Sequence, residues 1–133
     1  MGAKSAVIID DEPDITTYLA ALLSDQGWQV RTANSSADGL ALLEQQRPDV
    51  VLLDIMMPEK GGLHTLVAIR KNPALAGLPV ILVSGIQEKL SADYHAFLER
   101  FKHYRPDAFL DKPVDPAQLL ATIDQALTSA AAK

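Results

Sequence analysis

The sequence predicts an α/β protein, a doubly wound (βα)5 fold built on a parallel sheet of five strands. Short apolar runs alternate along the chain with patterns of helical spacing, which is typical of βα units. The runs at Val50–Leu53 and Pro79–Ser84 carry few polar residues, as strands buried on both faces do. The run Gln29–Ala33 alternates polar and apolar residues, which indicates a sheet edge. Together these features favour the strand order 2-1-3-4-5.

Each strand is bounded by residues that stop it. We expect strands over Ser5–Ile9, Gln29–Ala33, Val50–Leu53, Pro79–Ser84 and Ala108–Leu110. Their ends coincide with acids, glycines or prolines, which favour turns. The sequence shows no internal repeat and no interior linker, so we expect one unit throughout.

The intervening segments predict helices with recognisable ends. Pro13 opens the first, and Gly27 suits the left-handed position past its end. Asn34–Ser36 offers N-caps for the second, and Gly61–Gly62 begins the third. A long apolar stripe across Leu90–Phe101 predicts an extended fourth helix. Asp115, with a proline next and a glutamine three residues on, predicts the cap of the last helix.

Length and composition indicate one globular domain. The 133 residues are expected to form a core over about 5–128, with 129–133 a tail or the start of a linker. Hydrophobic residues make up 48% and charged residues 22% of the chain, as in soluble proteins. A net charge of −5 argues against a nucleic-acid surface. No run is long enough for a membrane span and the N-terminus lacks a signal peptide, so we expect a cytoplasmic protein.

The absence of cysteine narrows the chemistry further. With no cysteine in the chain, disulfide scaffolds, zinc–thiolate sites and cysteine nucleophiles are excluded. The three histidines are too scattered along the sequence to predict a metal site. Any metal would therefore be bound by oxygen atoms.

Polar residues stand where the apolar strands end. Asp10, Asp11 and Glu12 follow the first strand, Asp54 the third, Ser84 the fourth, and Lys112 the fifth. In an open α/β sheet the carboxyl ends of the strands meet at one edge, and ligands bind where the strand order reverses. Because a buried bare carboxylate is costly, Asp54 is expected at the mouth of the sheet. The first and third strands are neighbours in the expected order, so the aspartates should converge.

Three carboxylates that converge predict a cation or a shared proton. Oxygen ligands without histidine or cysteine suit Mg²⁺, with Mn²⁺ as a second possibility. Lys112 adds a positive charge that suits a phosphate, and Ser84 adds a hydroxyl. An acid nucleophile, a divalent ion, a lysine and a hydroxyl predict phosphoryl transfer, with an aspartyl phosphate formed at Asp54.

These residues, in this order, resemble the receiver domain of two-component response regulators. The resemblance rests on Asp10–Asp11, Asp54 with Pro58 four residues on, Ser84, and Lys112–Pro113, each at a strand end. Taken singly, the serine reads as a turn residue and the lysine as a surface cation. Together with Gly61–Gly62 after Pro58, these matches in order are specific, and they extend along essentially the whole chain. The resemblance also implies a flavodoxin-like topology, an inference that the handedness and order rules for such sheets already favour.

The resemblance implies a role for each site residue. Asp54 would be the phosphoacceptor. Asp11 and Asp54 would bind Mg²⁺ together with the backbone carbonyl of Met56, and Asp10 would act through water. A phosphoryl oxygen would be bound by Lys112, whose bond to Pro113 is expected to be cis.

The resemblance also implies a switch. Ser84 would hydrogen-bond the phosphoryl group, and Phe109 would follow it inward as the switch aromatic. This movement would change the surface formed by the helix over Leu90–Phe101, the strand at Ala108–Leu110 and the last helix.

The resemblance implies partners as well. The phosphoryl donor would be a phosphohistidine on a histidine kinase or a histidine phosphotransfer protein. The downstream partner would be an output domain or protein. The chain would be a monomer or a phosphorylation-dependent dimer. It would not be an enzyme beyond its own phosphorylation and dephosphorylation. The segment from Ser84 to Lys112 is longer than in common members by roughly a turn and a half, taking ~3.6 residues per turn, so the usual dimer does not transfer safely.

Other functions fit the sequence less well. A degenerate receiver that only binds a partner is the main alternative, although no residue needed for phosphorylation is missing. A flavodoxin would place a phosphate-binding loop, not acids, after the first strand, and a dinucleotide fold would show G-x-G-x-x-G. A phosphatase with its nucleophile at Asp10 would find a second acid at Glu12 but would leave Asp54 unexplained.

Overall fold

A computed structural model describes residues 4–55, 57, 61–84, 96, 99 and 105–131 of the chain. Nine elements lie in this part of the chain. They are β1 (Ser5–Ile9), α1 (Pro13–Asp25), β2 (Gln29–Ala33), α2 (Ser36–Gln45), β3 (Val50–Asp54), α3 (Gly62–Lys71), β4 (Val80–Ser84), β5 (Ala108–Asp111) and α6 (Pro116–Ala131). The helix predicted over Leu90–Phe101 lies outside the described residues, apart from the helical Ala96 and Glu99.

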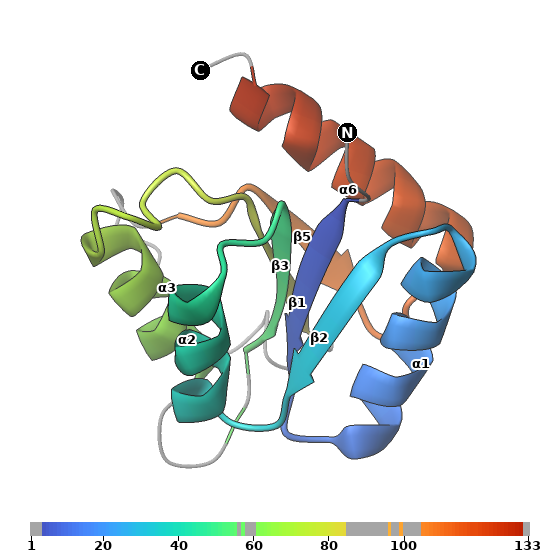
Figure 1. Ribbon diagram of the computed structural model, residues 1–133, viewed down its shortest axis with the longest axis horizontal. Coiled ribbons are helices and arrows are strands. Elements are labelled where there is room, and N and C mark those ends of the chain that lie inside the picture. Colours follow the sequence, from blue (N-terminus) through green and yellow to red (C-terminus); the bar gives the residue numbers. More distant parts are fainter. Residues whose placement is uncertain are drawn as a thin grey trace.

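All five strands form one parallel sheet in the order β2-β1-β3-β4-β5, which confirms the predicted order. Figure 1 shows the sheet between two helical layers, with α1 and α6 on one face and α2 and α3 on the other. β2 and β5 are the edge strands, which confirms that the alternating run of β2 lies at a sheet edge. The two central strands β1 and β3 pair from Ala6 with Val50 to Ile9 with Leu53.

The sheet separates two hydrophobic clusters, one on each face. Along β1, Ala6 and Ile8 belong to the cluster with α1 and α6, while Val7 and Ile9 belong to the cluster with α2 and α3. Every residue of β3 and β4 is buried. This burial on both faces is the reason why the central runs are continuously apolar rather than alternating.

Most of the predicted helix ends are confirmed. Gly27 has a φ of +86°, the left-handed conformation that glycine adopts without strain. The Ser35 hydroxyl accepts a hydrogen bond from the Asp38 N–H, and the Asp115 carboxylate accepts one from the Gln118 N–H. Both are N-caps that satisfy backbone groups left free at a helix start. In the described part of the chain, no helix has the length and apolar character needed to cross a membrane.

Candidate functional site

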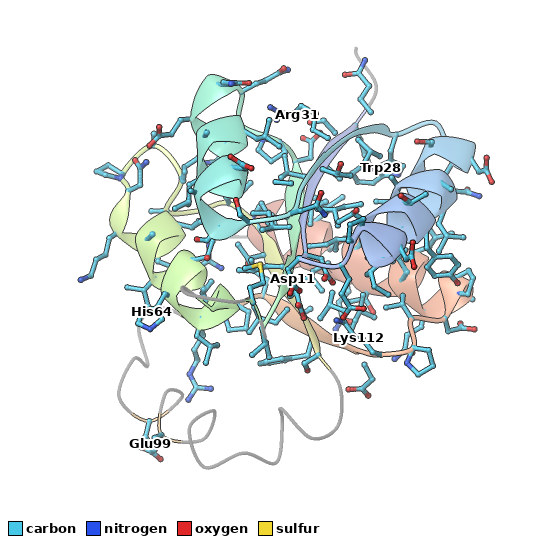
Figure 2. The ribbon with its side chains drawn as sticks, turned by 90° about the horizontal axis from the view of Figure 1, so that it is seen from below. Asp11, Trp28, Arg31, His64, Glu99 and Lys112 are labelled. Carbon is cyan, nitrogen blue, oxygen red and sulfur yellow. The ribbon has the colours of Figure 1, made fainter. Side chains whose placement is uncertain are left out.

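The polar residues predicted at the strand ends gather at the carboxyl edge of the sheet. Figure 2 looks onto this edge, where Asp11 and Lys112 lie beside the ends of the strands. Asp10 follows β1, Asp54 and Ser84 are the last residues of β3 and β4, and Lys112 follows β5. The parallel pairing of β1 with β3 and of β3 with β4 brings these ends together.

Asp54 lies deeper than the sequence suggests. It is at the end of its strand, as expected, but it belongs to β3 and is only 2% exposed. Lys112 Nζ lies 3.1 Å from its Oδ1 and donates a hydrogen bond to it. The carboxylate is therefore buried together with a cation rather than solvated at an open mouth, which lowers the cost of its burial.

Lys112 brings its ammonium group to several acids at once. Its Nζ lies 3.4 Å from Asp10 Oδ2 and 3.9 Å from Glu12 Oε1, in addition to the contact with Asp54. The Lys112 N–H donates to the Ser84 carbonyl at 2.9 Å, which fixes the loop against the end of β4. The bond between Lys112 and Pro113 is cis, which confirms the expectation from the resemblance.

Burial dominates the electrostatics of this pocket. It raises the pKa of Asp54 to about 7, and the neighbouring carboxylate of Asp10 acts in the same direction, while Lys112 opposes both. Burial also raises the pKa of Asp10. For Lys112 burial alone would lower the pKa, but the charges of Asp54 and Asp10 outweigh it and raise the pKa. The pocket thus holds more negative charge than one lysine balances.

A cluster of acids lies next to this ion pair. The carboxylates of Asp10, Asp11 and Glu12 offer oxygen atoms within 4.8 Å of one another. Among the described residues Asp54 is not part of that cluster, and Lys112 contacts both Asp54 and Asp10. A set of oxygen donors with no nitrogen or sulfur suits a hard ion such as Mg²⁺. The donor set of this pocket therefore fits the metal that the sequence predicts.

Ser84 is the one described residue whose buried side-chain hydroxyl lacks a hydrogen-bond partner. Ser84 is fully buried at the end of β4, where its position in the sheet is opposite Asp111 of β5. A buried hydroxyl without a partner costs about 1–3 kcal/mol. An oxygen-rich ligand beside Asp54 would supply the missing partner, so this hydroxyl supports a site for an oxyanion.

Met56 and Phe109 are the two remaining site residues that the sequence predicts. Met56, whose carbonyl was expected to bind the metal, lies outside the described residues. Phe109 lies on β5 opposite Leu82 and is 38% exposed, so its ring is not a fully buried core side chain. That partial exposure is compatible with the predicted switch role, which stays a prediction.

The structure adds contacts of Glu12 and Asn34 that the sequence did not indicate. Glu12 was recognised as part of the acidic run, but its contact with Lys112 depends on the turn after β1. Asn34 was considered as one of three possible N-caps, and its side chain instead donates to the Asp10 carbonyl. Nothing in the spacing of an asparagine after a strand could have indicated that contact.

Gly62 allows α3 to approach the end of β3. A Cβ atom at this position would overlap the Asp54 carbonyl oxygen, and the Gly62 N–H donates to the Ile55 carbonyl at 2.8 Å. Gly62 was predicted as a flexible helix start. Its close approach to backbone atoms is the stronger reason for a glycine here.

The fold and the pocket define a class of protein. The class is a doubly wound parallel α/β domain with an acid pair, a buried aspartate and a lysine at the switch point of its sheet. Within that class the comparisons with known proteins are specific. A family model described as the response regulator receiver domain matches residues 6–124. The chain belongs to the response regulator receiver domain family of two-component systems.

Individual relatives agree with this assignment. The chain is 35% identical to Protein PilH of Pseudomonas aeruginosa, over 91% of this chain and 95% of that protein. It is 32% identical to Protein Rrf1 of Nitratidesulfovibrio vulgaris, over 92% of this chain and 82% of that one. The structure of a CheY-like receiver domain protein from Methanospirillum hungatei matches with a TM-score of 0.84 and 28% identity, over 98% of both chains. Receiver domains in general bind Mg²⁺ in an acidic pocket and interact with histidine kinases and output domains.

Proposed function

We propose that this protein is a phosphorylatable signalling switch whose phosphoacceptor is Asp54. The observation that carries the proposal is the ion pair of 3.1 Å between the buried carboxylate of Asp54 and Lys112, with the acids after β1 beside it. A carboxylate held in one orientation can act as a nucleophile, and the lysine supplies positive charge where a phosphoryl oxygen would lie.

The proposed reaction transfers a phosphoryl group from a phosphohistidine of a sensor kinase or a phosphotransfer protein. A carboxylate oxygen of Asp54 attacks phosphorus while the nitrogen–phosphorus bond breaks, and the imidazole leaves with the bonding electron pair and takes up a proton. Such a reaction depends on positioning and on neutralising the charge of the phosphoryl oxygens. Because the proposed donor, a kinase or a phosphotransfer protein, belongs to the same signalling system, we expect the exchange to occur in the cytoplasm.

The proposed metal site uses Asp10, Asp11, Asp54 and the Met56 carbonyl, with Mg²⁺ or Mn²⁺ as the ion. When bound, such an ion neutralises the negative charge that develops on the phosphoryl oxygens. The proximity of Asp10 and Asp11 oxygens supports this assignment. Lys112 already contacts Asp10 and Asp54, so it lies where it can bind a phosphoryl oxygen on Asp54.

The proposed response begins at Ser84. Its buried hydroxyl has no partner and would donate a hydrogen bond to a phosphoryl oxygen on Asp54. The Ser84 carbonyl already accepts a hydrogen bond from the backbone N–H of Lys112. A movement of Ser84 would therefore also displace the chain at the end of β5. Phe109 and the exposed side of β5 and α6 would then present a changed surface to an output domain or a partner protein.

The test is phosphorylation of the purified protein by acetyl phosphate with Mg²⁺, followed by intact mass. The unaltered chain and Asp124→Asn, which changes an exposed aspartate of α6, should each gain one phosphoryl group. Asp54→Asn should gain none. No gain in the unaltered chain would favour the alternative of a receiver that acts only by binding a partner. A gain that persists in Asp54→Asn would show that another residue is the acceptor.

A further inference from the structure

Asn34 lies against the turn that carries the acids. It follows β2 directly, and its side-chain amide donates to the Asp10 carbonyl at 2.9 Å. The same nitrogen makes a second, longer hydrogen bond of 3.4 Å to Thr16 Oγ1. Asp10 is the first residue after β1, and Thr16 lies in the first turn of α1. One amide group therefore contacts both ends of the turn between β1 and α1.

The contacts around Asp10 leave its backbone little freedom. Its N–H donates to the Ala33 carbonyl at 3.1 Å, and its carbonyl accepts from Asn34. The Asp10 Oδ1 accepts from the Glu12 N–H at 2.9 Å, which folds the turn around the carboxylate. The peptide groups on both sides of Asp10 are thus held by two consecutive residues, Ala33 and Asn34, at the end of the neighbouring strand.

Thr16 is arranged to accept from Asn34. Its hydroxyl donates to the Pro13 carbonyl at 2.9 Å, which leaves the lone pairs of Oγ1 available. Thr16 is only 3% exposed, so this acceptor has little access to water. The hydrogen bond from Asn34 therefore gives this buried oxygen a donor.

We propose that Asn34 is a positioning residue for Mg²⁺, which keeps Asp10, Asp11 and Glu12 close together before the ion arrives. The three carboxylates lie within 4.8 Å of one another and repel, and Lys112, which contacts Asp10 and Glu12, offsets only part of that repulsion, so the turn tends to open when no metal ion is bound. Contacts at both ends of the turn oppose that opening. A turn held in place does not have to be ordered by the ion, and the ion then binds more tightly. This inference rests on the proposed function of the pocket.

The test compares Mg²⁺ binding with stability. Isothermal titration calorimetry with Mg²⁺ alone should give a dissociation constant about tenfold higher for Asn34→Ala than for the unaltered chain. Tenfold is about the smallest loss of affinity expected when a residue that contacts a metal ligand is removed. The Tm in the presence of a chelator should change little, because Asn34 is exposed and caps no helix. The Mg²⁺ concentration for half-maximal phosphorylation by acetyl phosphate should rise by the same factor, while the rate at saturating Mg²⁺ stays near that of the unaltered chain.

The chain offers a matched control. Asn72 follows α3 at the opposite edge of the sheet, and its side-chain oxygen accepts one hydrogen bond, from the nearby Ala74 N–H at 3.0 Å. Asn72→Ala should leave Mg²⁺ affinity unchanged. Thr16→Val removes the second acceptor at constant shape and should weaken Mg²⁺ binding by less than Asn34→Ala. The double variant should lose less than the product of the two factors, because both act through one contact.

The outcomes separate this inference from the function it rests on. If the unaltered chain does not bind Mg²⁺, the proposed metal site fails and this inference fails with it. If the unaltered chain binds Mg²⁺ and Asn34→Ala binds it equally well, only the role of Asn34 is overturned. Equal losses of affinity in Asn34→Ala and Asn72→Ala would also overturn it, since the effect would then not depend on the turn after β1.

Discussion

Lys112 places one ammonium group among several carboxylates, and this position gives it two opposing effects. Nζ lies within ion-pair distance of Asp54, Asp10 and Glu12, so it neutralises part of the negative charge that would attract Mg²⁺. The same ammonium would stabilise the charge that develops on a transferred phosphoryl group. Metal binding and phosphoryl transfer therefore respond to this residue with opposite signs.

Replacing Lys112 with alanine should separate these effects. We expect Mg²⁺ to bind more tightly, because a competing cation is removed from beside Asp54 and Asp10. Phosphorylation at saturating Mg²⁺ should slow by on the order of 100-fold, as when one charge-stabilising donor is removed from an active site. Calorimetry and the rate of mass gain with acetyl phosphate measure the two quantities. Weaker Mg²⁺ binding in Lys112→Ala would contradict the arrangement described here, and Lys71→Ala on α3 serves as the lysine control.

The raised pKa of Asp54 makes stability depend on pH. Its pKa of about 7 in the folded state exceeds the ordinary value of 3.8, so the folded chain binds more protons than the unfolded chain between these values. The contribution of Asp54 to the free energy of unfolding is therefore greatest below about pH 4, and this contribution is lost as pH rises through about 7.

Asp54→Asn should remove this contribution. In the presence of a chelator, we expect the variant and the unaltered chain to have similar stability at pH 4, and the variant to be more stable at pH 8 by up to a few kcal/mol. The measurement is urea denaturation at a series of pH values. Asp124→Asn, at an exposed position, should run parallel to the unaltered chain throughout. Parallel curves for Asp54→Asn would contradict the burial cost inferred for this carboxyl group.

At the scale of single residues, sequence reasoning identified which side chains meet but not how deeply they lie. The convergence of Asp10, Asp54 and Lys112 follows from topology, because parallel strands end at one edge. Asp54 is 2% exposed and is paired with Lys112, a residue far away in the sequence, and no local pattern indicates that depth. The contact from Asn34 to Asp10 depends on the register of β1 with β2, and so it was also missed.

At the scale of elements, the start of α3 is fixed by its approach to β3. The Gly62 N–H donates to the Ile55 carbonyl, and a side chain at Gly62 would overlap backbone atoms of Asp54 rather than the end of a movable side chain. The Thr65 hydroxyl adds a buried hydrogen bond of 2.6 Å with Ser36 of α2. The first turns of α2 and α3 are therefore joined by a hydrogen bond beside β3.

Gly62→Ala should destabilise the fold by more than the roughly 1–3 kcal/mol typical of an extra methyl group in a packed core, because backbone atoms have to move. Urea denaturation gives the change in the free energy of unfolding. Gly77→Ala is the matched control, since the nearest atom to a Cβ there is Arg47 Nη2 at 4.0 Å, and its effect should stay within about 0.5 kcal/mol. Similar stability of the two variants would show that α3 can shift away from β3 without cost.

Element boundaries were more predictable than this packing. Pro13, Gly27 and Asp115 stand at the ends of helices as their backbone preferences require. The continuous apolar runs of β3 and β4 indicated central strands because both faces of the sheet are covered. Local chemistry therefore sets where elements begin and end, whereas the distance between α3 and β3 is set by contacts across the chain.

At the scale of the whole molecule, the two central strands carry the acids that repel one another, so the pocket opposes the stability of the core around it. Asp10 directly follows β1 and Asp54 ends β3, and both strands are buried on both faces. Burial raises the pKa of both aspartates, and for Asp54 the neighbouring Asp10 carboxylate raises the pKa further. A cation that binds only the folded chain would relieve the repulsion and would stabilise every element packed on these strands.

Mg²⁺ should therefore stabilise the whole fold rather than the pocket alone. At a concentration about 100 times the dissociation constant, binding to the folded state adds about 2.7 kcal/mol, which raises the Tm of a domain of this size by roughly 10 °C. The gain should be larger at pH 8 than at pH 5, because the ion binds the deprotonated carboxylates and Asp54 is protonated below about pH 7. Calorimetric melting with Mg²⁺ or a chelator measures it, and Asp11→Asn, which removes one acid of the cluster, should show a smaller shift. An unchanged Tm at saturating Mg²⁺ and pH 8, or an equal shift in Asp11→Asn, would contradict a metal held by these acids.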